Sequence, residues 1–171
     1  RVYFSSLSNA SNNNISFTYS YSYNSNLYNA KSLFNITSVD GITWSGMDTI
    51  ATTGKNDQQF SFSSSKNIVV YQDSTANDFD IFYRTSTDAG LTWSDQALLV
   101  GENLSQSHPR IVKDSNGKTW LYYIQQEATP FEGIVQSNIK FIYSFDDGVT
   151  WSAPENFTKY VGYDENYNLS L

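Results

Sequence analysis

Apolar and polar side chains alternate with a period of two residues along much of this chain. The clearest alternating segments are 15–23, 67–72, 79–86, 119–125 and 139–144. They are rich in β-branched and aromatic residues, and Gly, Asn, Asp and Ser bound them, as is typical of β-strands. Helical periodicity is nearly absent. The pattern therefore predicts an all-β protein.

One short sequence recurs three times between these segments. It reads SVDGITWS at 38–45, STDAGLTWS at 86–94 and SFDDGVTWS at 144–152. The glycines of the three copies, Gly41, Gly90 and Gly148, are 49 and 58 residues apart. A repeat of this length indicates stacked supersecondary units. It does not indicate a catalytic loop, because an active site normally occurs once per domain.

Each repeat predicts four strands, and the acidic sequence forms the turn between the third and the fourth. The predicted strands are 2–7, 15–23, 31–37, 43–50, 58–62, 67–72, 79–86, 93–100, 108–113, 119–125, 138–144 and 151–157. Asn116-Gly117 is a strong hairpin signal. A four-stranded antiparallel meander is the blade of a β-propeller. We therefore expect blades at 1–53, 54–103 and 104–160, with 161–171 starting a fourth blade or closing the ring.

The copies at 86–93 and 144–151 resemble the Asp-box, or BNR repeat, Ser-x-Asp-x-Gly-x-Thr-Trp, of sialidase-like β-propellers. The motif also occurs in sortilin-type receptors and some glucanases. In the first copy, counted back from Trp44, Val39 holds the Asp position and Asp40 follows it. That turn is either degenerate or one residue shorter. Propeller rings need about four to eight blades, so the resemblance implies half of a six-bladed propeller, completed by further sequence or by another chain.

We expect the acidic turns to be structural. The Asp carboxylate and the Ser hydroxyl of such a turn can accept backbone N–H bonds, and Gly supplies a positive φ. The structural residues so predicted are Asp40, Gly41, Trp44, Ser86, Asp88, Gly90, Trp93, Ser144, Asp146, Gly148 and Trp151. The three turn tryptophans are expected to be buried at the start of each fourth strand. Asp147 is expected to be an exposed neighbour, and Trp120 to face a blade rim or a ligand surface.

Composition argues against several classes of function. The net charge is −7 and the 10 basic residues do not cluster, so nucleic acid is not an expected partner. Cys is absent and His108 is the only histidine, which leaves no thiol nucleophile and no Cys- or His-rich zinc site. His108 is more simply part of a strand than of a Ser-His triad. No apolar run approaches the ~18 residues of a membrane span.

The first residues of the chain indicate that it is a piece of a longer protein. It begins with Arg1 instead of Met and shows no signal peptide. A mature, trimmed or partial piece of a longer protein is the simplest explanation.

A sialidase-like site, as the resemblance implies, needs three arginines for the substrate carboxylate, a Tyr–Glu nucleophile pair and an Asp acid/base. The chain has only Arg1, Arg84 and Arg110. Arg110, in a predicted inner strand, is the best candidate to face the central axis, whereas Arg84 more simply supports its blade. The family's Arg-Ile-Pro signature is absent, because Pro109-Arg110-Ile111 has a different order.

Two acidic pairs have both a functional and a structural interpretation. Glu127 and Glu132 belong to the longest predicted loop, where they are either an acid pair for glycoside hydrolysis or solvated residues. Asp78 and Asp80 either help to bind Ca²⁺ or belong to a polar turn. Tyrosines at alternate positions of one strand either stack on sugar rings or pack against a neighbouring sheet; they are Tyr19, Tyr21 and Tyr23. No other cofactor is expected.

Six N-glycosylation sequons occur, against about four expected by chance from the composition. They begin at Asn9, Asn14, Asn35, Asn103, Asn156 and Asn168. They favour an extracellular or cell-surface glycoprotein, with Asn103 the most accessible and Asn35 the least. Two functions remain open. One is a module that binds glycans or surface proteins, and the other is a sialidase-like exo-glycoside hydrolase whose catalytic set is completed outside this stretch.

Overall fold

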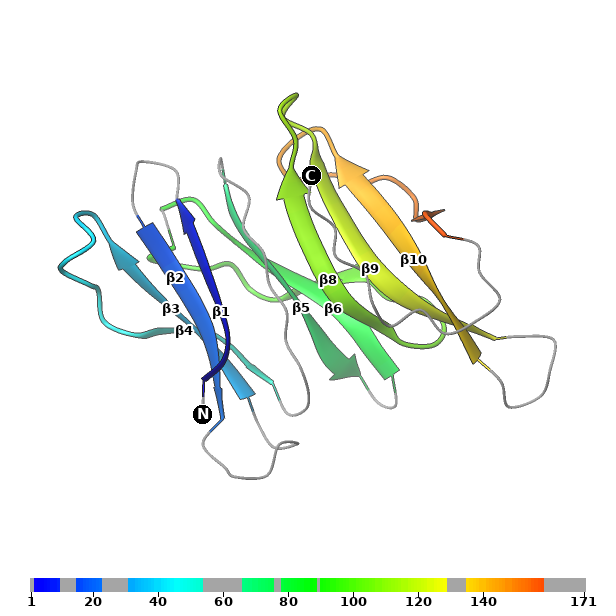
Figure 1. The fold of residues 1–171 in the computed structure, drawn as a ribbon, viewed down its shortest axis with the longest axis horizontal. Helices are drawn as coiled ribbons and strands as arrows, with labels where there is room; N and C mark the ends of the chain where they lie inside the picture. Colours follow the sequence, from blue (N-terminus) through cyan, green and yellow to red (C-terminus); the bar gives the residue numbers. More distant parts are fainter. Residues whose placement is uncertain are drawn as a thin grey trace.

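The computed structural model describes residues 2–9, 15–22, 31–53, 66–75, 78–88, 90–128 and 135–158. This part of the chain is all-β, as predicted, and its strands form three antiparallel sheets. Figure 1 shows the sheets side by side in chain order, from the blue first sheet to the yellow and orange third. No helix of the described part is long and apolar enough to cross a membrane.

Each sheet is a meander in which consecutive strands pair. The first sheet contains β1 (Val2–Asn9), β2 (Ile15–Ser22), β3 (Lys31–Ser38) and β4 (Asp48–Thr53). The second contains β5 (Asn67–Thr75), β6 (Asp78–Ser86) and β7 (Ala97–Val100). The third contains β8 (Gln106–Lys113), β9 (Thr119–Ala128), β10 (Val135–Ser144) and β11 (Glu155–Asn156). The strand expected at 58–62 lies outside the described residues.

The last strand of each meander begins later than the sequence pattern predicted. β4, β7 and β11 each start four residues after the turn tryptophan, whereas the predicted strands started at the tryptophan or, in the first repeat, one residue before it. A serine next to each tryptophan explains the delay. In the third sheet, the Ser152 N–H donates to the Tyr143 carbonyl at 2.9 Å, and the Tyr143 N–H donates to Ser152 Oγ at 3.1 Å. The serine hydroxyl thus takes the place of a ladder carbonyl and postpones regular pairing.

The core lies between the sheets, and the alternation along β5 places it there. Ile68 and Val70 point toward the third sheet, whereas Val69 and Tyr71 point toward the first, and all four are fully buried. Successive side chains of a strand point to opposite faces, so a strand between two sheets must be apolar on both. The cluster shared with the third sheet also contains Ile81, Val100, Ile111, Leu121, Tyr123 and Ile142. The cluster toward the first sheet also contains Ile50 and Phe82.

The tryptophans do not all occupy the positions that were expected. Trp93 and Trp151 are only partly buried, at the edges of the two core clusters, and Trp44 is 38% exposed. The prediction of three equivalent buried rings is therefore wrong for Trp44. Trp120 lies on the other face of β9 from the core residue Leu121, where Asp114 Oδ2 accepts its indole N–H at 3.0 Å. Lys118 Nζ lies 3.7 Å from the centroid of this ring.

Candidate functional site

The acidic turn of the third sheet is held by its own side chains. Ser144 Oγ accepts the Gly148 N–H at 2.8 Å and donates to Asp146 Oδ1 at 2.7 Å. The same carboxylate accepts the Thr150 N–H at 2.8 Å and the Thr150 hydroxyl at 2.6 Å. Gly148 has a φ of +79°, which glycine adopts without strain. Asp146 is therefore occupied in closing the turn.

The other two turns repeat this arrangement, the first of them in a shorter form. Asp88 accepts the N–H and hydroxyl of Thr92 at 2.9 and 2.5 Å. In the first turn Asp40 accepts the Thr43 N–H at 2.7 Å and its hydroxyl at 3.1 Å, while Val39 is exposed. Asp40 thus forms the same bonds to a threonine as Asp88 does, and the first turn is one residue shorter.

These bonds stabilise the ionised carboxylates. The Thr92 and Thr150 hydroxyls, followed by the backbone N–H groups of the same residues, lower the pKa of Asp88 and of Asp146 to about 2. In the first turn the Thr43 and Ile42 N–H groups lower the pKa of Asp40 to about 2. A carboxylate that accepts several such bonds favours its charged form.

Acid should therefore weaken the turns. Because the folded-state pKa of Asp146 lies below its unfolded value, its contribution to stability is complete above about pH 4 and is lost as the pH falls toward 2. We expect Asp146→Ala to lower the melting temperature at pH 7 and to show a shallower decline between pH 4 and 2 than the wild type. Thermal unfolding at a series of pH values measures this. Parallel curves for the two proteins would contradict it.

The turns also join neighbouring sheets, which the sequence did not indicate. The Gly90 carbonyl accepts Asn35 Nδ2 of β3 at 3.1 Å. A Cβ placed on Gly148 would lie 2.8 Å from Ile68 Cδ1 of β5. The side chain of Asp147 is 39% exposed, near to what was expected, but its carboxylate also pairs with Lys113 Nζ of β8 at 2.5 Å. The acidic turns are thus structural contacts.

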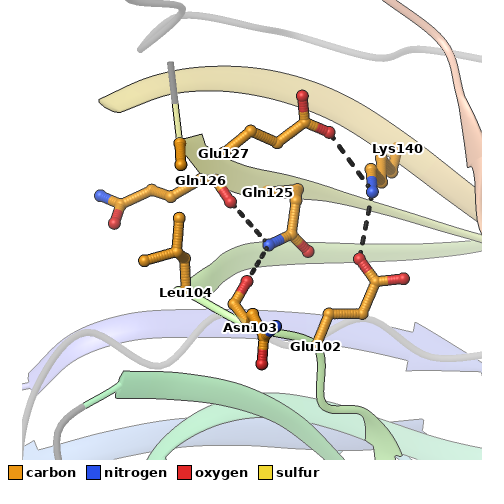
Figure 2. A pocket seen from close by; sticks show the side chains of 8 residues that line it. Glu102, Asn103, Leu104, Gln125, Gln126, Glu127 and Lys140 are labelled. Carbon is orange, nitrogen blue, oxygen red and sulfur yellow. Dashed lines mark hydrogen bonds and ion pairs between the residues drawn. The ribbon is translucent and has the colours of Figure 1, made fainter. Parts of the chain in front are cut away.

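An open pocket of about 540 Å³ lies at the other end of the third sheet. Its lining residues come from the segment that joins β7 to β8, from the end of β9 and from β10 (Figure 2). They are Glu102, Asn103, Leu104, Gln125, Gln126, Glu127, Ala128 and Lys140. In the β9–β10 ladder Thr119 pairs with Ser144 beside the acidic turn, whereas Glu127 pairs with Gln136 at the pocket end. The pocket is therefore separated from the acidic turn by the length of β9.

Two carboxylates share one ammonium group at this pocket. Lys140 Nζ lies 3.1 Å from Glu102 Oε2 and 3.4 Å from Glu127 Oε1, as Figure 2 shows. Glu127 Oε2 also accepts the Asn138 amide at 2.9 Å and the Gln136 amide at 3.3 Å. Burial raises the pKa of Glu127, but the hydrogen bonds from these amides and from Lys140 outweigh it and lower the pKa below its usual value.

Two buried glutamines hold the pocket wall in place. Gln106 Oε1 accepts the Glu102 N–H at 3.2 Å, and Gln106 Nε2 donates to the carbonyls of Glu102 and Leu104. Gln125 Nε2 donates to the Asn103 carbonyl at 3.1 Å and to the Gln126 carbonyl at 2.8 Å. These bonds maintain a φ of +67° at Leu104, a conformation that is rare for a branched side chain.

Of the acids predicted from the sequence, Glu127 lies in the pocket and Glu132 is outside the described residues. Glu102 and Lys140 were not predicted from the sequence. They are 38 residues apart, and no motif connects them. Only the packing of the β7–β8 segment against β10 could have identified the pair.

Neither described arginine lines the pocket, and Arg1 is outside the described residues. Arg110 is exposed on β8 and donates to the Pro109 carbonyl at 3.1 Å. Arg84 donates to the Ser94 carbonyl at 3.0 Å and so supports its own turn. His108 occupies a β-bulge with a φ of +55°, and its Nδ1 lies 3.0 Å from Ser107 Oγ.

The remaining candidates are the acidic pair at the start of β6 and the tyrosines predicted on the second strand. Asp78 is exposed and Asp80 partly buried at the start of β6, and the described residues contain no cluster of three or more His, Cys, Asp or Glu side chains suited to a metal ion. The Tyr19 ring is tilted against Phe17 and Phe34, with centroids 5.7 Å apart in each case. The side chains of Tyr21 and Tyr23 lie outside the described part.

The chain matches no protein-family model and no curated protein. It is similar in structure to an α-L-arabinanase of Penicillium chrysogenum complexed with arabinobiose, with a TM-score of 0.68, 17% identity, and coverage of 84% of this chain and 46% of that one. The Fusarium graminearum α-L-arabinofuranosidase Arb93A gives a TM-score of 0.69 at 18% identity, over 94% of this chain and 51% of that one.

A third similar structure is the Hadza microbial sialidase Hz136, with a TM-score of 0.63 at 14% identity, over 88% of this chain and 36% of that one. The chain thus spans about half the length, or less, of these solved structures. They are β-propeller glycoside hydrolases, and the likeness, at such low identity, extends to the fold alone. The three antiparallel meanders of this chain accordingly form part of a β-propeller.

Proposed function

We propose that this chain is half of a six-bladed Asp-box propeller that binds glycans at the pocket between Glu102, Glu127 and Lys140. The observation that carries the proposal is the pocket itself: an open cavity with charged and amide side chains in its lining, whose wall is held in a strained conformation by buried glutamines. Residues kept in rare backbone conformations concentrate at functional sites. The glycan-acting enzymes that share the fold support the choice of ligand.

Binding accounts for the electrostatics of the pocket better than hydrolysis does. A glycosidase needs one carboxylic acid that stays protonated at the working pH, with a raised pKa. Hydrogen bonds and Lys140 instead lower the pKa of Glu127. Glu102 faces the same ammonium group. Glu127 therefore does not match the proton donor of a hydrolase.

One observation favours hydrolysis as a second candidate function. The Glu102 and Glu127 oxygens that contact Lys140 can be no farther apart than its two contact distances combined. The largest separation of these two oxygens thus falls within the range of carboxyl spacings in glycosidases, about 5–9.5 Å. In this alternative one carboxylate is the nucleophile or base, and the acid comes from the remainder of the propeller.

Calorimetric titration of the full chain with neutral oligosaccharides tests both functions. We expect at least one of arabinobiose, galactobiose and lactose to bind, and Glu127→Gln to weaken that binding at least about tenfold, because the amide loses a charged acceptor. Glu155→Gln, at an exposed position of β11, is the matched control and should bind like the wild type. Sugar release that disappears in Glu127→Gln would favour the hydrolase. Absence of binding to all three sugars would contradict the proposal.

We also propose an extracellular, N-glycosylated protein. Asn156 is exposed on β11 and is the sequon we expect to be occupied, whereas Asn35 is fully buried and should stay unmodified. Asn103 is exposed but lines the pocket, so a glycan there would compete with a ligand. Mass spectrometry of protein from a secreting eukaryotic host measures occupancy. A modified Asn35, or an unmodified Asn156, would contradict this expectation.

A further inference from the structure

We infer that the pocket recognises a neutral sugar unit through its hydroxyl groups and discriminates against sugars that carry a carboxylate. This inference rests on the proposed glycan-binding function. It adds the chemical class of the ligand, which follows from the balance of hydrogen-bond donors and acceptors around Gln125, Glu102 and Glu127.

Gln125, a residue of the pocket wall, has an unused and almost wholly covered acceptor. The residue is 1% exposed, and its side chain makes two hydrogen bonds to described residues, both donations from Nε2, to the Asn103 and Gln126 carbonyls. Rotating the amide would bring Oε1 against two carbonyl oxygens, so the orientation is determined. Gln125 Oε1 has no hydrogen-bond partner among the described residues. A buried acceptor without a partner is costly, and a ligand donor at this position removes that cost.

The charged groups of the pocket also favour a donor. The carboxylates of Glu102 and Glu127 accept hydrogen bonds only. Lys140 supplies the cationic donor of the group, and both carboxylates already contact it. Among the charged groups, an incoming ligand therefore meets acceptors in excess. Sugar hydroxyl groups can donate to such acceptors, whereas a ligand carboxylate cannot.

A ligand carboxylate would also be repelled. Two carboxylates against one ammonium leave the pocket with an excess negative charge. Like charges a few ångströms apart repel strongly where solvent is partly excluded. Arg84 and Arg110, which could offset a ligand carboxylate, do not line the pocket. The site thus differs from the arginine-lined carboxylate site that the resemblance to sialidases implies.

Matched sugar pairs test the inference on the full chain. Galactobiose and digalacturonic acid differ in the oxidation of C6, and lactose and 3′-sialyllactose differ in an added sialic acid. We expect a neutral member to bind and its acidic counterpart to bind at least about tenfold more weakly in 20 mM salt. The ratio of the affinity for the neutral sugar to the affinity for the acidic sugar should be smaller in 0.5 M salt, because salt screens the repulsion.

Removing one pocket charge should change the same ratio. Glu102→Gln keeps the shape of the side chain and is expected to reduce the preference for the neutral sugar at least threefold. Glu155→Gln, outside the pocket, should leave the ratio unchanged. An acidic sugar that binds as tightly as its neutral counterpart, or a ratio unaffected by Glu102→Gln, would overturn the inference while leaving glycan binding intact. No binding by any probe would overturn both proposals.

Discussion

Replacing Trp151 with alanine is expected to lower the free energy of unfolding by about 3 kcal/mol, near the lower end of values for large aromatic residues. The Trp151 ring packs against the core cluster between the second and third sheets. Its indole N–H donates to the Gly148 carbonyl at 3.2 Å and ties the ring to its own turn. The substitution therefore leaves a cavity at the edge of the contact between the sheets and removes a bond that closes the turn.

Trp44 provides a matched control, because it holds the same position in the first acidic turn but is 38% exposed. Trp44→Ala should cost less, about 1 kcal/mol, which is the centre of values for point substitutions. Denaturant unfolding of both variants measures the difference. Equal losses would show that the tryptophans act through the turns alone and not through the contact between sheets.

The second large effect is expected for Gly148→Ala, which should also cost about 3 kcal/mol. An alanine at a φ of +79° is strained by about 1–2 kcal/mol. Its Cβ would in addition lie 2.8 Å from Ile68 Cδ1, in the fully buried core. Overpacking of this kind typically costs 1–3 kcal/mol.

Two further variants separate strain from overpacking. Gly117 has a φ of +83°, and its nearest neighbour would be the flexible end of Lys113 at 3.8 Å, so Gly117→Ala should show the strain alone, about 1 kcal/mol. Ile68→Val removes the clashing methyl group and should make the added cost of Gly148→Ala smaller. A double-mutant cycle measured by denaturant unfolding gives this coupling. If Gly148→Ala and Gly117→Ala are equally destabilised, or if the coupling is absent, the turn does not join the sheets as the structure indicates.

The two ends of the third sheet therefore have different roles. At one end the acidic turn contacts the second sheet through Gly148, and its carboxylate is committed to hydrogen bonds within the turn. At the other end the β7–β8 segment and β9 leave an open pocket with an unused acceptor. Changes in the turn should alter stability, and changes in the pocket should alter binding. The effects of the turn variants on stability can thus be measured separately from the effects of the pocket variants on binding.

Features that depend on near neighbours in the chain could be predicted from the amino-acid sequence. The all-β architecture follows from the alternation of side chains, and the hairpin at Gly117 from the local bond between its N–H and the Asp114 carbonyl at 3.0 Å. The acidic turns belong to the same class, because Ser144, Asp146 and Thr150 bond to one another across six residues. Interactions this short need no knowledge of the fold.

Contacts between residues far apart in the chain could not be predicted, because they depend on how the sheets pack. Glu102 and Lys140 form the pocket because the β7–β8 segment passes beside β10, and the contact of Gly148 with Ile68 depends on how two sheets stack. The exposure of Trp44 shows the same limit, since it ends the same Gly-x-Thr-Trp sequence as the better buried Trp151. Burial depends on the neighbouring sheet that a side chain meets, and a local motif carries no information about that neighbour.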